Sequence, residues 1–130
     1  MKASDLKELL ELERKLYAQI SETIDLTQNL LDSVERNDQV AVHMLLSMRQ
    51  RPILEMEEVQ SYISLKRIDL NHQDAQRFDA LLSGALPENR DELPLTKQLS
   101  MNQRFLERLT ELDRLVSHKL CGDRSYYQNQ

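Results

Sequence analysis

Between Met1 and Pro52 the chain contains neither glycine nor proline, so no residue in this stretch strongly opposes a helix. Apolar residues recur there at alternating steps of four and three, the spacing of a helix that buries one narrow stripe against a partner helix. A helix over about residues 4–36 is roughly 50 Å long at 1.5 Å per residue, and it cannot bury its stripe alone. Only two polar positions interrupt the stripe, which runs through Leu6, Leu10, Glu13, Tyr17, Ile20, Ile24, Thr27, Leu31 and Val34.

A second helix is predicted over about residues 39–67, after the polar break at Asn37 and Asp38. Its stripe keeps the same phase on both sides of Pro52, although a proline inside a helix costs roughly 3 kcal/mol. The preserved phase favours one kinked but continuous helix, and the alternative is two helices broken near Arg51. Because the connection at residues 37–38 is so short, the first two helices must lie side by side and antiparallel.

Two shorter patterns complete the chain. A short helix is predicted over about 73–83, ended by Gly84, and a long one over about 95–120, with Pro94 in its first turn and Gly122 at its end. The fold class is therefore all-α: a long, coiled-coil-like antiparallel helical hairpin with a short third helix and a long C-terminal helix, forming a bundle. One domain covers residues 1–120, and residues 121–130 form a flexible tail. The last helix either docks on the hairpin or offers its leucines to a partner helix.

The composition excludes several classes of protein. The net charge is −5 with both signs interspersed along the chain, so no basic face is available for a nucleic acid. The single cysteine cannot form an internal disulfide, which fits a reducing compartment. No segment resembles a signal peptide or a membrane span, so we expect a cytoplasmic protein without direct membrane insertion.

The residues that carry catalysis or bind metals are sparse. None of the three histidines has a glutamate three residues before it or a second histidine four residues away, so the usual helical metal patterns are missing. His118 and Cys121 share one helical turn, but no third group to orient them is indicated, and they are interpreted as residues of the last turn. We therefore expect no enzyme, no metal and no cofactor.

The layout resembles a known family, the FlgN-type chaperones of flagellar type III export. The opening helix carries LLELE at residues 9–13, and a polar turn leads into NDQVAVHMLL at residues 37–46. The last helix carries NQRFLERL at residues 102–109, similar to the asparagine-, arginine- and leucine-rich last helix of that family. The chain departs from the family at Asn37, where glycine is common, and at Pro52, in a run that is usually free of proline.

The resemblance implies a bacterial cytoplasmic chaperone that binds the helical termini of secreted hook-associated proteins, the proteins of the hook-filament junction. Such a chaperone prevents premature assembly and delivers its cargo to the flagellar export gate. Contact with the gate is expected at Tyr126 or Tyr127 in the tail. The alternative is a self-associating coiled-coil adaptor without a secretion role, and a weak homodimer is compatible with the chaperone. Carried onto this sequence, the cargo-binding residues are Arg104, Phe105, Leu106, Arg108, Leu109, Leu112, Leu115 and Val116.

Overall fold

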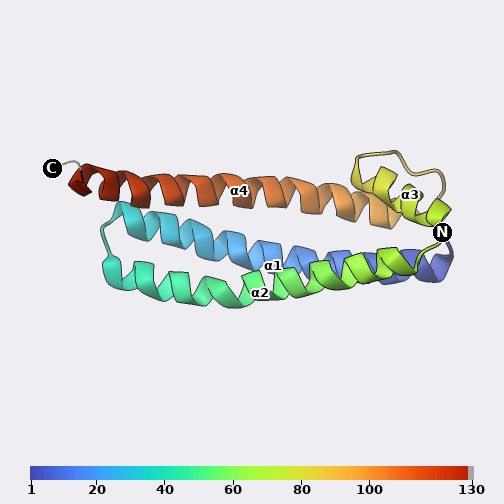
Figure 1. Ribbon diagram of the computed structural model, residues 1–130, viewed down its shortest axis with the longest axis horizontal. Coiled ribbons are helices and arrows are strands. Elements are labelled where there is room, and N and C mark those ends of the chain that lie inside the picture. Colours follow the sequence, from blue (N-terminus) through green and yellow to red (C-terminus); the bar gives the residue numbers. More distant parts are fainter. Residues whose placement is uncertain (129–130) are drawn as a thin grey trace.

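The structure, a computed structural model, describes the backbone of residues 1–128 and the side chains of residues 1–121. It confirms the all-α fold class, with no strand in residues 1–128. Three long helices and one short helix follow each other along the chain (Figure 1). They are α1 (Ala3–Glu35), α2 (Gln39–Asp69), α3 (His72–Leu82) and α4 (Leu93–Gln128).

The central rod of the bundle is α1, which packs against both α2 and α4 along its length. α2 returns antiparallel to α1, and α3 then reverses the chain so that α4 runs parallel to α1 (Figure 1). Within the described residues, no Cα of α2 lies within 8 Å of a Cα of α4. Each outer helix therefore depends on α1 for its packing, and the open question of whether the last helix docks on the hairpin is answered.

The buried face of α1 is wider than the stripe predicted from the sequence. Leu9, Leu16, Thr23 and Leu30 recur every seven residues and are buried, although the predicted stripe omits all four. Residues of the predicted stripe such as Tyr17 are only half-buried. The prediction considered one partner helix, whereas α1 has two, and two partners on one helix cover a broader arc.

The turn between α1 and α2 is built from its two polar residues. Asn37 adopts a left-handed conformation with a φ of 56°, which asparagine tolerates better than most residues. The N–H of Asn37 donates to the carbonyl of Val34 at 3.1 Å and the N–H of Asp38 donates to that of Ser33 at 3.0 Å, which closes α1 in a Schellman motif. The carboxylate of Asp38 then accepts from the N–H of Ala41 at 3.1 Å and caps α2.

The other boundaries agree with the sequence in part. Pro52 lies inside a continuous α2, so the prediction of an unbroken second helix is confirmed. Gly84, with a φ of 98°, follows α3 as predicted. The first helix was predicted from about residue 4, and α1 begins at Ala3, after Lys2, whose side chain makes no capping hydrogen bond. The predicted end at Gly122 is wrong, because α4 continues to Gln128 and so extends into the segment predicted as a tail.

Replacing Asn37 tests the turn. A β-branched residue is disfavoured in the left-handed region, so Asn37→Val should lower the free energy of unfolding by about 1–2 kcal/mol. Asn37→Gly should leave it unchanged or raise it slightly, because glycine adopts this conformation without strain. Urea unfolding followed by circular dichroism measures both variants. Equal stability of the two would show that the turn does not depend on the left-handed residue.

Candidate functional site

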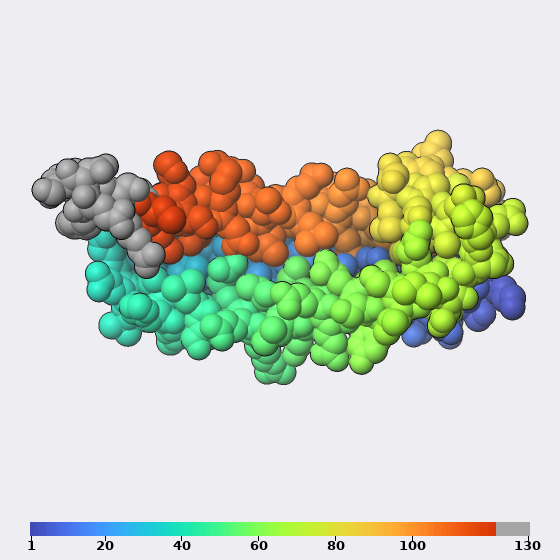
Figure 2. Space-filling view, viewed as in Figure 1, coloured from blue at the N-terminus to red at the C-terminus, as the bar shows by residue number. Residues whose placement is uncertain are grey.

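A groove lies between α2 and α4. Its floor is α1, whose blue atoms are visible between the green α2 and the orange α4 in the space-filling view (Figure 2). The groove has a volume of about 740 Å³, and α3 contributes Leu82 to its wall. Its apolar lining consists of Leu16, Ile63, Leu82, Leu99 and Leu106, and its polar lining of Glu13, Gln60, Ser64, Asn102, Gln103, Glu107, Thr110 and Glu111.

The groove exists because α2 and α4 both pack on α1 while their backbones stay apart, with no Cα pair between them within 8 Å in the described residues. Farther along the bundle an ion pair spans the two outer helices, between the guanidinium of Arg49 on α2 and the carboxylate of Asp113 on α4. At the opposite end of the bundle, α2 is tied to α1 by Lys66, whose ammonium lies 2.9 Å from Asp5 and 2.8 Å from Glu8.

A buried carboxylate lies in the floor of the groove. Glu13 is only 3% exposed. The side-chain amide of Asn102 donates to Glu13 Oε2 at 2.7 Å and to the backbone carbonyl of Glu13 at 2.9 Å. Gln98 donates in turn to Asn102 Oδ1 at 2.9 Å, so the amide of Asn102 is held in this orientation.

Glu13 has no cationic partner among the described residues. Burial removes water from the carboxylate and raises its pKa above the ordinary value, and the hydrogen bond from Asn102 opposes this only in part. The residues that line the groove include three glutamates and no lysine, arginine or histidine. One of these, Glu111, forms an ion pair with Arg114 at 2.7 Å. Glu13 and Glu107 have no such ion pair among the described residues. The groove therefore combines an apolar lining with uncompensated negative charge.

The structure places three of the eight predicted cargo residues in the core. Leu109, Leu112 and Val116 are buried against α1. Phe105 is half-buried, with its ring centroid 4.9 Å from that of Tyr17. A partner can reach the three buried side chains only if α4 separates from α1, and the assignment of cargo contacts to them stays a prediction with that condition.

The remaining predicted site residues are distributed over the surface and the groove. Leu106 alone of the predicted cargo residues lines the groove. Leu115 is half-buried, and Arg104 and Arg108 are exposed. α4 runs through the predicted gate residues Tyr126 and Tyr127, whose side chains lie outside the described residues.

Sequence reasoning did not find the groove, although a signal for it was present. Glu13 is a polar interruption of the first stripe, and Asn102 interrupts the apolar spacing of the last helix between Leu99 and Leu106. Two polar residues in two apolar stripes indicate a shared polar layer, but nothing in the chain alone pairs them. The wall residues Ile63 and Leu82 become neighbours of this layer only through the packing of α2 and α3.

Within the described part of the chain, no three histidine, cysteine, aspartate or glutamate side chains gather in an arrangement that could hold a metal ion. None of the described helices has both the length and the apolar character needed to cross a bilayer. In comparisons with protein-family models, with curated proteins and with solved structures, nothing matches this chain. The resemblance to FlgN-type chaperones is therefore carried by the quoted residues alone.

The burial of Glu13 makes the free energy of unfolding depend on pH. Because the folded-state pKa is raised, the folded protein binds more protons than the unfolded chain in the pH window just above 4.5, and stability falls as pH rises through that window. Glu13→Gln should therefore be more stable than the parent at pH 7, with an advantage that shrinks towards pH 4. Urea unfolding across this range measures it, with the exposed Glu11→Gln as control. A constant difference at every pH would contradict the raised pKa.

The core position of Leu112 is tested by truncation. Leu112 is 1% exposed, so Leu112→Ala should lower the free energy of unfolding by about 2–5 kcal/mol through lost burial and a cavity. The matched change Leu86→Ala, at a leucine that is 83% exposed, should have little effect. Thermal and urea unfolding compare the two, and an unaltered stability of Leu112→Ala would show that α4 is not docked in solution.

Proposed function

We propose that this chain is an export chaperone of the FlgN type, and that it holds one amphipathic helix of its cargo in the groove between α2 and α4. The single observation that carries the proposal is the groove itself, an apolar furrow between two helices that lack direct backbone contact. A guest helix laid there contacts α1, α2 and α4 together and completes a four-helix arrangement. In this proposal the cargo surface is the groove rather than the buried face of α4.

The dimensions of the groove suit one face of a helix. Its lining follows α4 from Leu99 to Glu111, about 18 Å at 1.5 Å per residue, and follows α2 from Gln60 to Ser64, about 6 Å. About one turn of a guest therefore contacts all three helices, and roughly three turns can follow α4. The five apolar lining residues offer the kind of surface that binds residues at helical spacing. Each Å² of apolar surface removed from water contributes about 25 cal/mol before the cost of ordering the guest.

The charge of the groove specifies the guest further. A lysine or arginine among the apolar residues of the guest can pair with Glu13, whose Oε1 accepts no hydrogen bond from the described residues. Pairing stabilises a carboxylate whose burial is otherwise unfavourable. The net charge of −5 also favours a basic partner in the encounter. The preferred guest is therefore an apolar helical face that carries one basic residue.

The proposed cargo is the helical terminus of a hook-associated protein. Such a helix exposes an apolar stripe before it assembles, and a complementary groove covers that stripe reversibly until secretion. Delivery to the flagellar export gate is assigned to the end of α4, at Tyr126 and Tyr127. The setting of this activity is the bacterial cytoplasm.

Binding is tested with a fluorescent peptide that comprises the C-terminal helix of a hook-associated protein from the same organism. The parent chain should bind it one-to-one in an anisotropy titration. Leu82→Asp places a charge in the wall of the groove at a side chain that is 43% exposed, so it should weaken binding about tenfold or more without unfolding the bundle. Leu86→Asp, which changes an exposed leucine outside the lining, should bind as the parent does. Equal affinities of all three proteins would rule out the groove.

The pairing with Glu13 is tested by a cycle of two changes. A guest peptide whose basic residue is replaced by glutamine should bind the parent chain about tenfold more weakly, because it leaves the buried carboxylate unpaired. Glu13→Gln should bind the two peptides with similar affinity. If the preference for the basic peptide survives in Glu13→Gln, the guest does not reach this carboxylate.

A second candidate function, a self-associating adaptor without a secretion role, is favoured by the large apolar side chains that α2 exposes. Peptide binding separates the two candidates. A chaperone binds the hook-associated helix in a defined complex, whereas an adaptor ignores that helix and assembles with copies of itself.

A further inference from the structure

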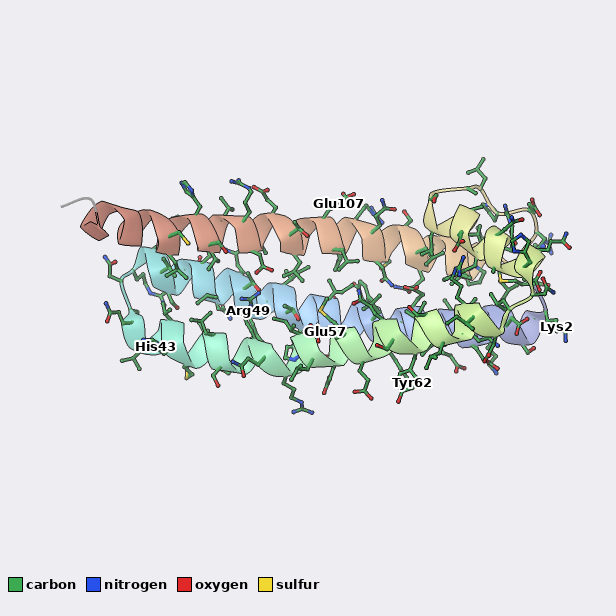
Figure 3. All side chains as sticks on the ribbon, in the orientation of Figure 1. Lys2, His43, Arg49, Glu57, Tyr62 and Glu107 are labelled. Carbon is green, nitrogen blue, oxygen red and sulfur yellow. The ribbon has the colours of Figure 1, made fainter. Side chains whose placement is uncertain are left out.

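α2 has a second apolar face, on the side turned away from α1. Along it lie Val40, Met44, Leu54, Leu65 and Ile68, whose side chains are between 56% and 81% exposed. The exposed Tyr62 also points away from the bundle on this side (Figure 3). A helix that packs against one partner is expected to carry polar residues on the face turned away from that partner. The packing of the monomer therefore does not explain these exposed apolar side chains.

The exposed residues form a regular stripe of their own. They follow steps of four and three residues, the spacing of a coiled-coil seam. The buried stripe of α2, which includes Leu45, Pro52 and Met56, has the same spacing but lies on the opposite side of the helix. The outer stripe consists of Val40, Met44, Ser47, Arg51, Leu54, Glu58, Ser61, Leu65 and Ile68, all of them exposed.

The outer stripe has the same order of residue classes in both directions. From either end it reads two apolar residues, a serine, a charged residue and then Leu54 at the centre. The two charged positions, Arg51 and Glu58, have opposite signs. A stripe with these properties is complementary to a second copy of itself related by a two-fold axis at Leu54, as an isologous interface requires.

We propose that the outer stripe of α2 binds the outer stripe of a second copy of this chain, with the two α2 helices antiparallel. Leu54 then packs on Leu54 of the partner subunit at the axis, and Arg51 pairs with Glu58 of the partner subunit on each side of it. Val40 and Met44 pack on Ile68 and Leu65 of the partner subunit at both ends. The contact follows about 42 Å of helix, from Val40 to Ile68, at 1.5 Å per residue.

The charges select this orientation. In a parallel pair with the same register, Arg51 faces Arg51 and Glu58 faces Glu58, which is repulsive, whereas the antiparallel pair makes two opposite-charge contacts. Within one copy the guanidinium of Arg51 is 85% exposed, and its ion pair is with Glu55 one turn away, at 3.2 Å. Such a pair stabilises a helix only weakly, so Arg51 remains available to a second copy.

The proposed dimer does not occupy the groove. None of the nine stripe residues lines the groove between α2 and α4, so both grooves of the dimer stay open. The inference therefore stands independently of the proposed chaperone function, and a dimer of this kind presents two cargo sites on one particle.

The oligomeric state of the full chain tests the proposal. Sedimentation equilibrium over a range of concentrations should show a monomer–dimer equilibrium. Leu54→Glu places two carboxylates together at the axis and should raise the dimer dissociation constant about tenfold or more. The matched control Leu86→Glu makes the same change at an exposed leucine outside the stripe and outside the groove and should leave the constant unchanged. A monomer at all concentrations, or a dimer insensitive to Leu54→Glu, would overturn the proposal.

A charge exchange tests the register and the orientation. Arg51→Glu and Glu58→Arg should each weaken the dimer, because each places like charges opposite one another twice. The double variant Arg51→Glu/Glu58→Arg should restore it, since the opposite-charge contacts return with reversed signs. Circular dichroism checks that helicity is retained in all variants. Failure of the double variant to recover association, with helicity intact, would contradict the antiparallel pairing.

Discussion

The structure depends on one constraint, the covering of α1 on two sides. No residue of α1 breaks the helix, and its buried positions recur every seven residues in two rows, one with Leu6 and Ile20 and the other with Leu9 and Leu16. These two rows alone have the spacing of one coiled-coil seam, but the half-buried Leu10, Tyr17 and Ile24 lie beside them and widen the face. Both α2 and α4 pack against this wider face. Because both outer helices are held by the central rod, they are free to stay apart, and a groove is the geometric result.

The polar contacts of the bundle fix its register rather than supply its stability. The hydrogen bonds from Asn102 to Glu13 align α4 with α1 at one height, and a buried polar pair of this kind selects one register at a cost in stability. The ion pair between Arg49 and Asp113 links α2 to α4 at a second height along the bundle. The apolar clusters between these layers supply the burial that holds the helices together.

α2 differs from the other long helices in having two apolar faces. Its inner face, with Leu45 and Met56, is buried within the monomer. Its outer face follows the same steps with apolar ends, two serines and two opposite charges around Leu54. The groove and this outer face belong to different sides of the same helix, so the proposed cargo site and the proposed dimer interface do not overlap.

Local chemistry in the sequence determined the helices and their turns. Three local features determine the helices and turns: the absence of glycine and proline before Pro52, the pair Asn37 and Asp38, and Gly84. Each affects only the backbone within a few residues of itself, and most boundaries and the fold class were therefore predictable. The tertiary structure alone decided which apolar residues of the last helix are core, and it placed Leu109 and Leu112 inside. Periodicity shows that one face of a helix will be buried but does not name the surface that buries it. A groove formed by three helices depends on where each of them packs, and no single stripe contains that information.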